Sequence, residues 1–157
     1  MPKRVGVFAN TSHLYHAIAS EFNGAKLSYE KYLQGAIGEH ELYRAYAYGT
    51  HTGTEASAFI IALKSLGFET RYRKTTKVLR DSIWNVGIAI DIFRLLDRLD
   101  IVVIGSNDYD MIPLVRFVRE RGVEAVVYAA QIPPQLSSSA NRSIEISSDM
   151  LERKPCS

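Results

Sequence analysis

Two patterns of apolar residues alternate along the chain. Short apolar runs between turn residues are typical of buried strands, whereas apolar side chains three or four positions apart are typical of helices. The clearest strand is Asp100 to Gly105 (DIVVIG), an unbroken apolar run. The same reasoning predicts strands over residues 4–9, 41–48, 68–73, 100–105, 123–129 and 143–146.

Helical stretches separate these predicted strands. They carry cap residues such as Asn and Ser before them and Gly after them, as helix ends usually do. The most apolar strands are continuous rather than alternating, which indicates burial on both faces. We therefore predict an α/β fold, a three-layer α/β/α sandwich with a mainly parallel sheet. The predicted helices cover residues 14–22, 28–37, 54–66, 84–96, 112–121 and 133–140.

Composition narrows the class of protein. With 157 residues, of which 46% are hydrophobic and 23% charged, the chain suits one globular domain, expected over residues 1–149 with a frayed tail at 150–157. The single cysteine, Cys156, excludes an internal disulfide and a cysteine zinc site. Without an apolar run long enough to cross a bilayer or a signal peptide, we expect a cytoplasmic protein and no membrane partner.

Polar side chains gather where the first and fourth predicted strands end. In open parallel sheets, ligands bind outside the carboxyl ends of the strands, so these residues are the first candidates for a site. Two more, Asn85 and Asp91, lie in the helix that precedes the fourth strand. The residues at the predicted edge are Asn10, His13, Ser106, Asn107, Asp108 and Asp110.

Four segments together resemble the NYN domain, a branch of the PIN-like nucleases. They are residues 7–16, 83–92, 103–115 and 135–146, and the resemblance spans roughly residues 4–147. Family members typically read Val-Phe-x-Asp-x-x-Asn-Leu in the first segment and Ser-Gly-Asp-x-Asp-Phe-x-Pro-Leu in the third. The resemblance implies a PIN-like fold and cleavage of RNA with Mg²⁺ or Mn²⁺, held by clustered carboxylates that activate water.

This sequence departs from the family pattern at its acidic positions. Asn10 and Asn85 stand where the family has aspartate, His13 where it has asparagine, and Asn107 where it has glycine. Each Asp-to-Asn exchange removes one charge, and a carboxylate–cation pair at about 4 Å is worth about 4 kcal/mol before desolvation. The fold should survive such changes more readily than the activity. Asn10 and Asn85 are either natural or engineered, whereas His13 and Asn107 are not usual silencing changes.

The resemblance assigns roles to the remaining site residues. Asp91, Asp108 and Asp110 would hold the metal, and Asn10 and Asn85 would act as neutral ligands or orient water. Asp108 or Asp110 alternatively caps the helix that follows. Asp91 needs a metal, an arginine or backbone donors beside it if it is buried; otherwise it lies on the solvent face of its helix.

His13 would bind a phosphate, substitute as a soft metal ligand or serve as a structural side chain, and we favour the structural reading. The stretch from residue 71 to residue 80 packs five cations and Tyr72 into ten residues. It would guide single-stranded RNA, with the cations on phosphates, or it would form a solvated strand edge. The predicted RNA-binding residues are Arg71, Arg73, Lys74, Lys77, Arg80 and Ser106.

Two functions remain open at this point. One is a divalent-metal-dependent ribonuclease. The other is a catalytically degenerate NYN domain that binds RNA or a protein partner without cutting. PIN-like domains often dimerise, so the resemblance also allows a homodimer, but the sequence identifies no surface for it.

Overall fold

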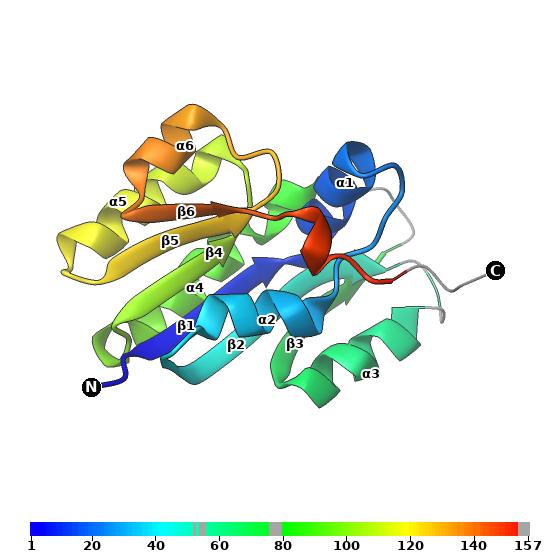
Figure 1. Ribbon diagram of the computed structural model, residues 1–157. Coiled ribbons are helices and arrows are strands. Elements are labelled where there is room, and N and C mark those ends of the chain that lie inside the picture. Colours follow the sequence, from blue (N-terminus) through cyan, green and yellow to red (C-terminus); the bar gives the residue numbers. More distant parts are fainter. Residues whose placement is uncertain (52, 54–55, 76–79, 154–157) are drawn as a thin grey trace.

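The core of the fold is one sheet of parallel strands. The computed structural model describes residues 1–51, 53, 56–75 and 80–153. Six strands pair in the order β3-β2-β1-β4-β5-β6, and each neighbouring pair is parallel (Figure 1). The predicted parallel sheet is therefore confirmed. The strands are β1 (Arg4–Asn10), β2 (Glu41–His51), β3 (Phe68–Lys74), β4 (Ile101–Gly105), β5 (Glu124–Ala129) and β6 (Arg142–Glu145).

Helices cover both faces of this sheet, as predicted. Buried residues of α1, α2 and α3 pack on one face, and those of α4, α5 and α6 pack on the other. The two faces give two separate apolar cores. The helices are α1 (Thr11–Glu21), α2 (Tyr29–Ile37), α3 (Ala56–Leu66), α4 (Asn85–Leu95), α5 (Ile112–Glu120) and α6 (Pro134–Ser139).

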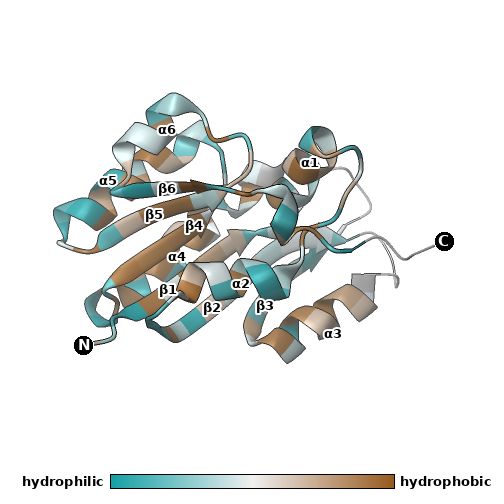
Figure 2. Cartoon of the chain, in the orientation of Figure 1, coloured by the Kyte–Doolittle hydropathy of each residue, from teal (hydrophilic) through white to brown (hydrophobic). Residues whose placement is uncertain are grey.

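The central strands are apolar on both sides because each side faces a helical layer. In β4, Ile101 and Val103 belong to the core under α1–α3, whereas Val102 and Ile104 belong to the core under α4–α6. This follows from the period of two along a strand. Figure 2 shows the result as continuous hydrophobic colouring along β4. Among the described residues, no helix combines the length and apolar character that crossing a bilayer requires.

The strand order places a crevice beside β1. From β1 the chain moves outward to β2 and β3, and then returns to the other side of β1 to form β4. Open parallel sheets bind ligands at such a reversal, outside the carboxyl ends of the two strands. Asn10, Tyr48 and Arg71 lie in register on β1, β2 and β3 at this edge of the sheet. Predicted site residues such as Asn10 and Arg71 therefore lie at the carboxyl edge of the sheet, next to the point where the strand order reverses.

The bounds of several elements differ from the sequence prediction. Strand β2 continues to His51, past the predicted end at residue 48. The tail expected to fray from residue 150 is instead bonded at its start: Ser28 N donates to Met150 O at 2.9 Å and Glu152 N to Lys26 O at 2.8 Å. These backbone bonds tie residues 150–152 to the segment before α2.

Candidate site at the carboxyl edge of the sheet

The junction of β1 and α1 is fixed by Asn10. Its side chain is buried, 1% exposed, and its Oδ1 accepts a hydrogen bond from His13 N at 3.2 Å, which makes it the N-cap of α1. Asparagine is among the best cap residues, so the sequence folds this way without a charge at position 10. The predicted site residue Asn10 is therefore also a structural one.

His13 links α1 to the loops after β4 and β5. Its Nε2 is hydrogen-bonded to Asn107 Oδ1, and Asn107 Nδ2 donates to the backbone oxygens of Ala130 and Gln131 at 2.9 and 3.2 Å. The residues that replace the family asparagine and glycine thus contact each other. This arrangement supports the structural reading of His13.

Asp108 takes the capping role that the sequence offered for it, and its second carboxylate oxygen contacts Asn85. Its Oδ1 accepts from the backbone N of Asp110 at 2.9 Å, which caps the short helix η3 (Tyr109–Met111). Its Oδ2 accepts from Asn85 Nδ2 at 3.0 Å, which joins the loop after β4 to the start of α4. Asp110 is exposed in the first turn of η3. The structure thus brings Asn85 and Asp108 together, as predicted from the edge of the sheet.

Asn85 keeps one polar atom unused. Its Oδ1 is buried and has no hydrogen-bond partner among the described residues, and the same holds for Trp84 Nε1 beside it. Buried polar atoms without partners are rare in folded proteins. The start of α4 therefore offers one donor, Trp84 Nε1, and one acceptor, Asn85 Oδ1, that are not used by the described residues.

Asp91 is buried and bound to an arginine. Arg71 Nε lies 3.0 Å from Asp91 Oδ2 and Arg71 Nη2 lies 3.2 Å from Oδ1, while the Tyr48 hydroxyl donates to Oδ2 at 2.8 Å. The predicted arginine partner is confirmed, and the alternative of a solvent-facing Asp91 is wrong. The hydrogen bond to Asp91 raises the pKa of Arg71; burial, and then the charge of Asp91, raise the pKa of Tyr48.

In β3, successive side chains of the cationic stretch that begins at residue 71 face opposite sides of the sheet. Arg71 lies 5.1 Å from the centre of the Tyr46 ring and Arg73 lies 5.8 Å from the Trp84 ring, both toward α4. Tyr72 packs with the opposite core. Lys74 is exposed at the end of β3, and Lys77 lies outside the described residues.

A shallow hollow of about 530 Å³ opens at the carboxyl edge, and we call it the edge hollow. Ser106 does not line it: this residue is 1% exposed, and its Oγ accepts from Asp108 N at 3.1 Å. Asp91 does not line it either, because its partners lie over β2 and β3. The residues of the edge hollow include His13, Arg80, Ser82, Asn107, Asp108 and Tyr109.

The residues present do not fit a resident divalent cation. Among the described residues, no group of three or more His, Cys, Asp or Glu side chains is placed to hold a metal. Asn85 and Asp91 lie six residues apart in α4, about 9 Å along its axis, and Arg71 already neutralises Asp91. Mg²⁺ and Mn²⁺ prefer charged oxygen ligands, and Asp108 is the carboxylate that the edge hollow offers.

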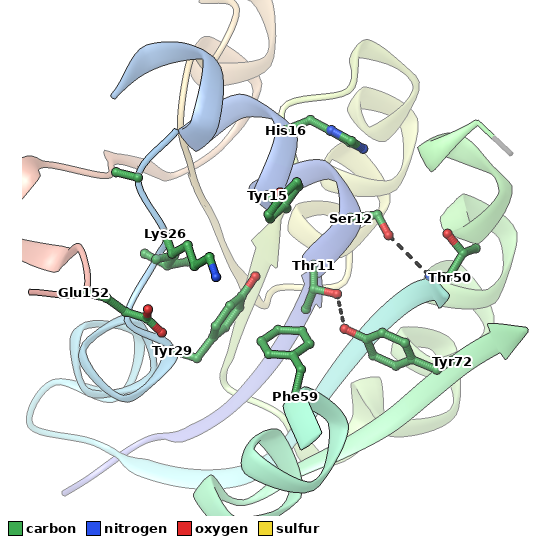
Figure 3. A pocket seen from close by; sticks show the side chains of 12 residues that line it. Thr11, Ser12, Tyr15, His16, Lys26, Tyr29, Thr50, Phe59, Tyr72 and Glu152 are labelled. Carbon is green, nitrogen blue, oxygen red and sulfur yellow. Dashed lines mark hydrogen bonds between the residues drawn. The ribbon is translucent and has the colours of Figure 1, made fainter. Parts of the chain in front are cut away.

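A second cavity, of about 470 Å³, lies on the other side of the start of α1 (Figure 3). We call it the aromatic pocket. Its rings come from α1, α2, α3 and β3, so no local sequence pattern links them, and sequence reasoning missed all but Tyr72. Its main residues are Thr11, Tyr15, Lys26, Tyr29, Phe59 and Tyr72.

Comparison with known proteins agrees with the fold described above. A protein of unknown function from Vibrio parahaemolyticus has a similar crystal structure, with a TM-score of 0.85 and 23% identity, over 96% of this chain and 97% of that chain. No curated protein matches the chain. Residues 4–149 match the sequence model of the NYN domain, whose nucleases generally act on RNA and use divalent metals. The match covers nearly the whole described chain, so the protein belongs to the NYN domain family and has its PIN-like nuclease fold.

Proposed function

We propose that this NYN domain binds single-stranded RNA at the carboxyl edge of its sheet without holding a resident divalent cation. The observation that carries the proposal is the pairing of Asp91 with Arg71. A carboxylate that already accepts three hydrogen bonds, two of them from a guanidinium, would have to lose them before it could bind a metal. Asn10 and Asn85 are neutral, and Asp108 has no second carboxylate beside it among the described residues that line the edge hollow.

Support for RNA as the ligand comes from the cations at this edge. Arg73, Lys74 and Arg80 are exposed, and Arg80 lines the edge hollow together with Asp108. Arginine and lysine on phosphates supply most of the affinity for a single strand, and a groove lined with cations follows the backbone of the strand. The family generally acts on RNA, which makes it the expected nucleic acid.

A second candidate is a metal-dependent ribonuclease, and one observation favours it. Asn85 Oδ1 is buried without a partner beside Asp108, so the two side chains would supply two oxygen ligands. Asp110, exposed in the first turn of η3, would supply a third. The bound Mg²⁺ or Mn²⁺ would polarise the scissile phosphate and activate water.

A binding and cleavage assay separates the two functions. We expect a fluorescent uridine octamer to bind equally well in EDTA and in Mn²⁺ and to stay intact. Arg73→Gln and Arg80→Gln should weaken binding. Each should also make the slope of log K against log salt concentration smaller by about 0.7, the value for one phosphate on a single strand. Arg116→Gln, an exposed arginine on α5, is the matched control and should bind as the native chain does.

Cleavage would reverse this conclusion under one condition. If Mn²⁺ produces fragments and Asp108→Ala abolishes them while the fold is kept, the ribonuclease is the correct function. An octamer that fails to bind in either buffer would instead count against both candidates.

A further inference from the structure

The aromatic pocket presents ring faces from separate elements to one cavity. Figure 3 shows Phe59 between Tyr29 and Tyr72, with Tyr15 of α1 on the opposite wall. Phe59 makes edge contacts with both neighbours, with ring centres 5.5 Å from Tyr29 and 6.4 Å from Tyr72. These contacts hold the wall in place before any ligand arrives.

Two of the rings are open to solvent. Tyr15 is 56% exposed and Phe59 is 40% exposed, although both belong to a cavity that is large enough for a small ligand. Exposed rings that stand singly on a surface are ordinary, whereas these two rings share one pocket. Flat ring faces of this kind are suited to stacking on another flat ring.

The polar groups around the rings are neutral or balanced in charge. Thr11 Oγ1 donates to Tyr48 O at 2.9 Å and is hydrogen-bonded to the Tyr72 hydroxyl, which fixes the Tyr72 ring. Burial raises the pKa of Tyr29, whose hydroxyl points into the pocket as a neutral donor (Figure 3). Lys26 and Glu152 stand at the same wall with opposite charges.

This charge balance limits the class of ligand. A site for a polyphosphate gathers several cations or backbone N–H groups. The aromatic pocket offers one lysine beside one carboxylate, so the part of the ligand that enters should be neutral. A neutral flat ring with hydrogen-bonding edges fits this description, with a single phosphate left at the mouth. A nucleotide unit of a strand has both, the ring as its base and the phosphate in its backbone.

The pocket and the edge hollow share the first turns of α1. Thr11, Tyr15 and His16 line the aromatic pocket, and His13 lines the edge hollow. A nucleic-acid strand that crosses the start of α1 would therefore reach both. We propose that the aromatic pocket is a nucleobase subsite, in which one base of the strand stacks on Phe59 and Tyr15; this rests on the proposed RNA binding at the carboxyl edge.

The test compares Phe59→Ala and Tyr15→Ala with Ile61→Ala, a control on the same helix as Phe59. Ile61 is 63% exposed and does not line the pocket. The loss of one stacking ring should weaken the binding of a uridine or adenosine octamer roughly five- to hundredfold. The control should bind as the native chain does, and an abasic octamer should bind all four proteins equally. Because the substituted rings are exposed, circular dichroism should show an unchanged fold.

A second arm separates this proposal from the RNA function. Uridine and adenosine 5′-monophosphate are titrated while the tyrosine resonances are followed by NMR. If no octamer binds but a mononucleotide shifts Tyr15 and Tyr29 in the native chain and not in Phe59→Ala, the subsite holds and the RNA function fails. If the octamer binds the native chain and both pocket variants equally, the RNA function holds and the subsite is overturned. If neither ligand binds, both are overturned.

Discussion

Arg71 on β3 and Asp91 on α4 form a two-point ion pair, with Nε to Oδ2 at 3.0 Å and Nη2 to Oδ1 at 3.2 Å. The pair joins the edge of the sheet to the helix that covers it. It also engages with each other a carboxylate that was predicted to hold a metal and a cation that was predicted to bind RNA. A buried aspartate that matches a family motif thus acts as a structural partner.

Substitution of Asp91 should lower stability. Asp91→Ala leaves the buried Tyr48 hydroxyl without its acceptor and Arg71 without its counter-charge. Breaking a fully buried pair costs about 3–5 kcal/mol, but Arg71 is 42% exposed and can be hydrated, so we expect a loss of about 2–3 kcal/mol. Urea unfolding at pH 7 measures it.

Asp110→Ala is the matched control, since Asp110 is exposed and should change stability by less than about 0.5 kcal/mol. Equal effects of the two substitutions would show that the Arg71–Asp91 pair contributes little.

Restoring the family aspartates should create a metal site. In the variant Asn10→Asp with Asn85→Asp, two carboxylates join Asp108, and position 85 no longer donates to Asp108 Oδ2. Like charges this close repel, so the variant should be less stable than the native chain without metal. Millimolar Mn²⁺ should bind it and raise its melting temperature, while the native chain shows no such rise.

Calorimetry with Mn²⁺ checks this directly, and Asp108→Ala in the restored variant should abolish the heat of binding. Tight, Asp108-dependent binding by the native chain would overturn the prediction and favour the ribonuclease.

Gly49 should be intolerant of a side chain. A Cβ at this position would lie 2.7 Å from Tyr72 Cε2 and 2.8 Å from Thr11 Oγ1, at the contact that fixes the Tyr72 ring. Overpacking of this kind typically costs about 1–3 kcal/mol, so Gly49→Ala should lower the melting temperature.

The control is Gly87→Ala in α4, where a Cβ meets only ordinary contacts at 3.5 Å from Trp84. Removing a helix-interior glycine should raise stability by about 0.5–1 kcal/mol. Opposite signs for the two substitutions are the expected result, and a neutral Gly49→Ala would mean that Tyr72 shifts without cost.

Stability should fall at alkaline pH through Tyr72. Burial raises the pKa of Tyr72 to about 12, against an ordinary value near 10. The folded state therefore keeps this proton where the unfolded state loses it. The contribution is complete below about pH 10 and disappears as the pH rises to about 12, for a total of roughly 2–3 kcal/mol.

Chemical denaturation at pH 9 and pH 11.5 measures this loss, and Tyr72→Phe, which has no proton to lose there, should show a smaller decrease. The same decrease in both proteins would assign the alkaline loss to other groups.

The order of the strands and helices was predictable because the spacing of apolar residues within each segment indicates its type. Apolar runs such as residues 101–105 need no knowledge of their neighbours, and the rule for parallel sheets then places Asn10 and Asp108 at one edge. The meeting of Asn85 with Asp108 followed from that rule and the family pattern.

Contacts between distant side chains were not predictable in the same way. No local sequence pattern indicates that Arg71 forms an ion pair with Asp91, twenty positions later. The alternation of a strand did carry a usable signal, since Arg71 and Tyr72 must face opposite sides of the sheet and cannot line one channel together. The aromatic pocket, built from four elements, had no such signal.

The backbone bond between Glu152 N and Lys26 O has a consequence for how this domain can diversify. The family match ends at residue 149, yet Glu152 and Lys26 form one wall of the aromatic pocket. That wall belongs to neither the sheet nor the helices packed on it. A substitution at Glu152, beyond the matched residues, would therefore change the charge at this wall while leaving the sheet and its helices as they are.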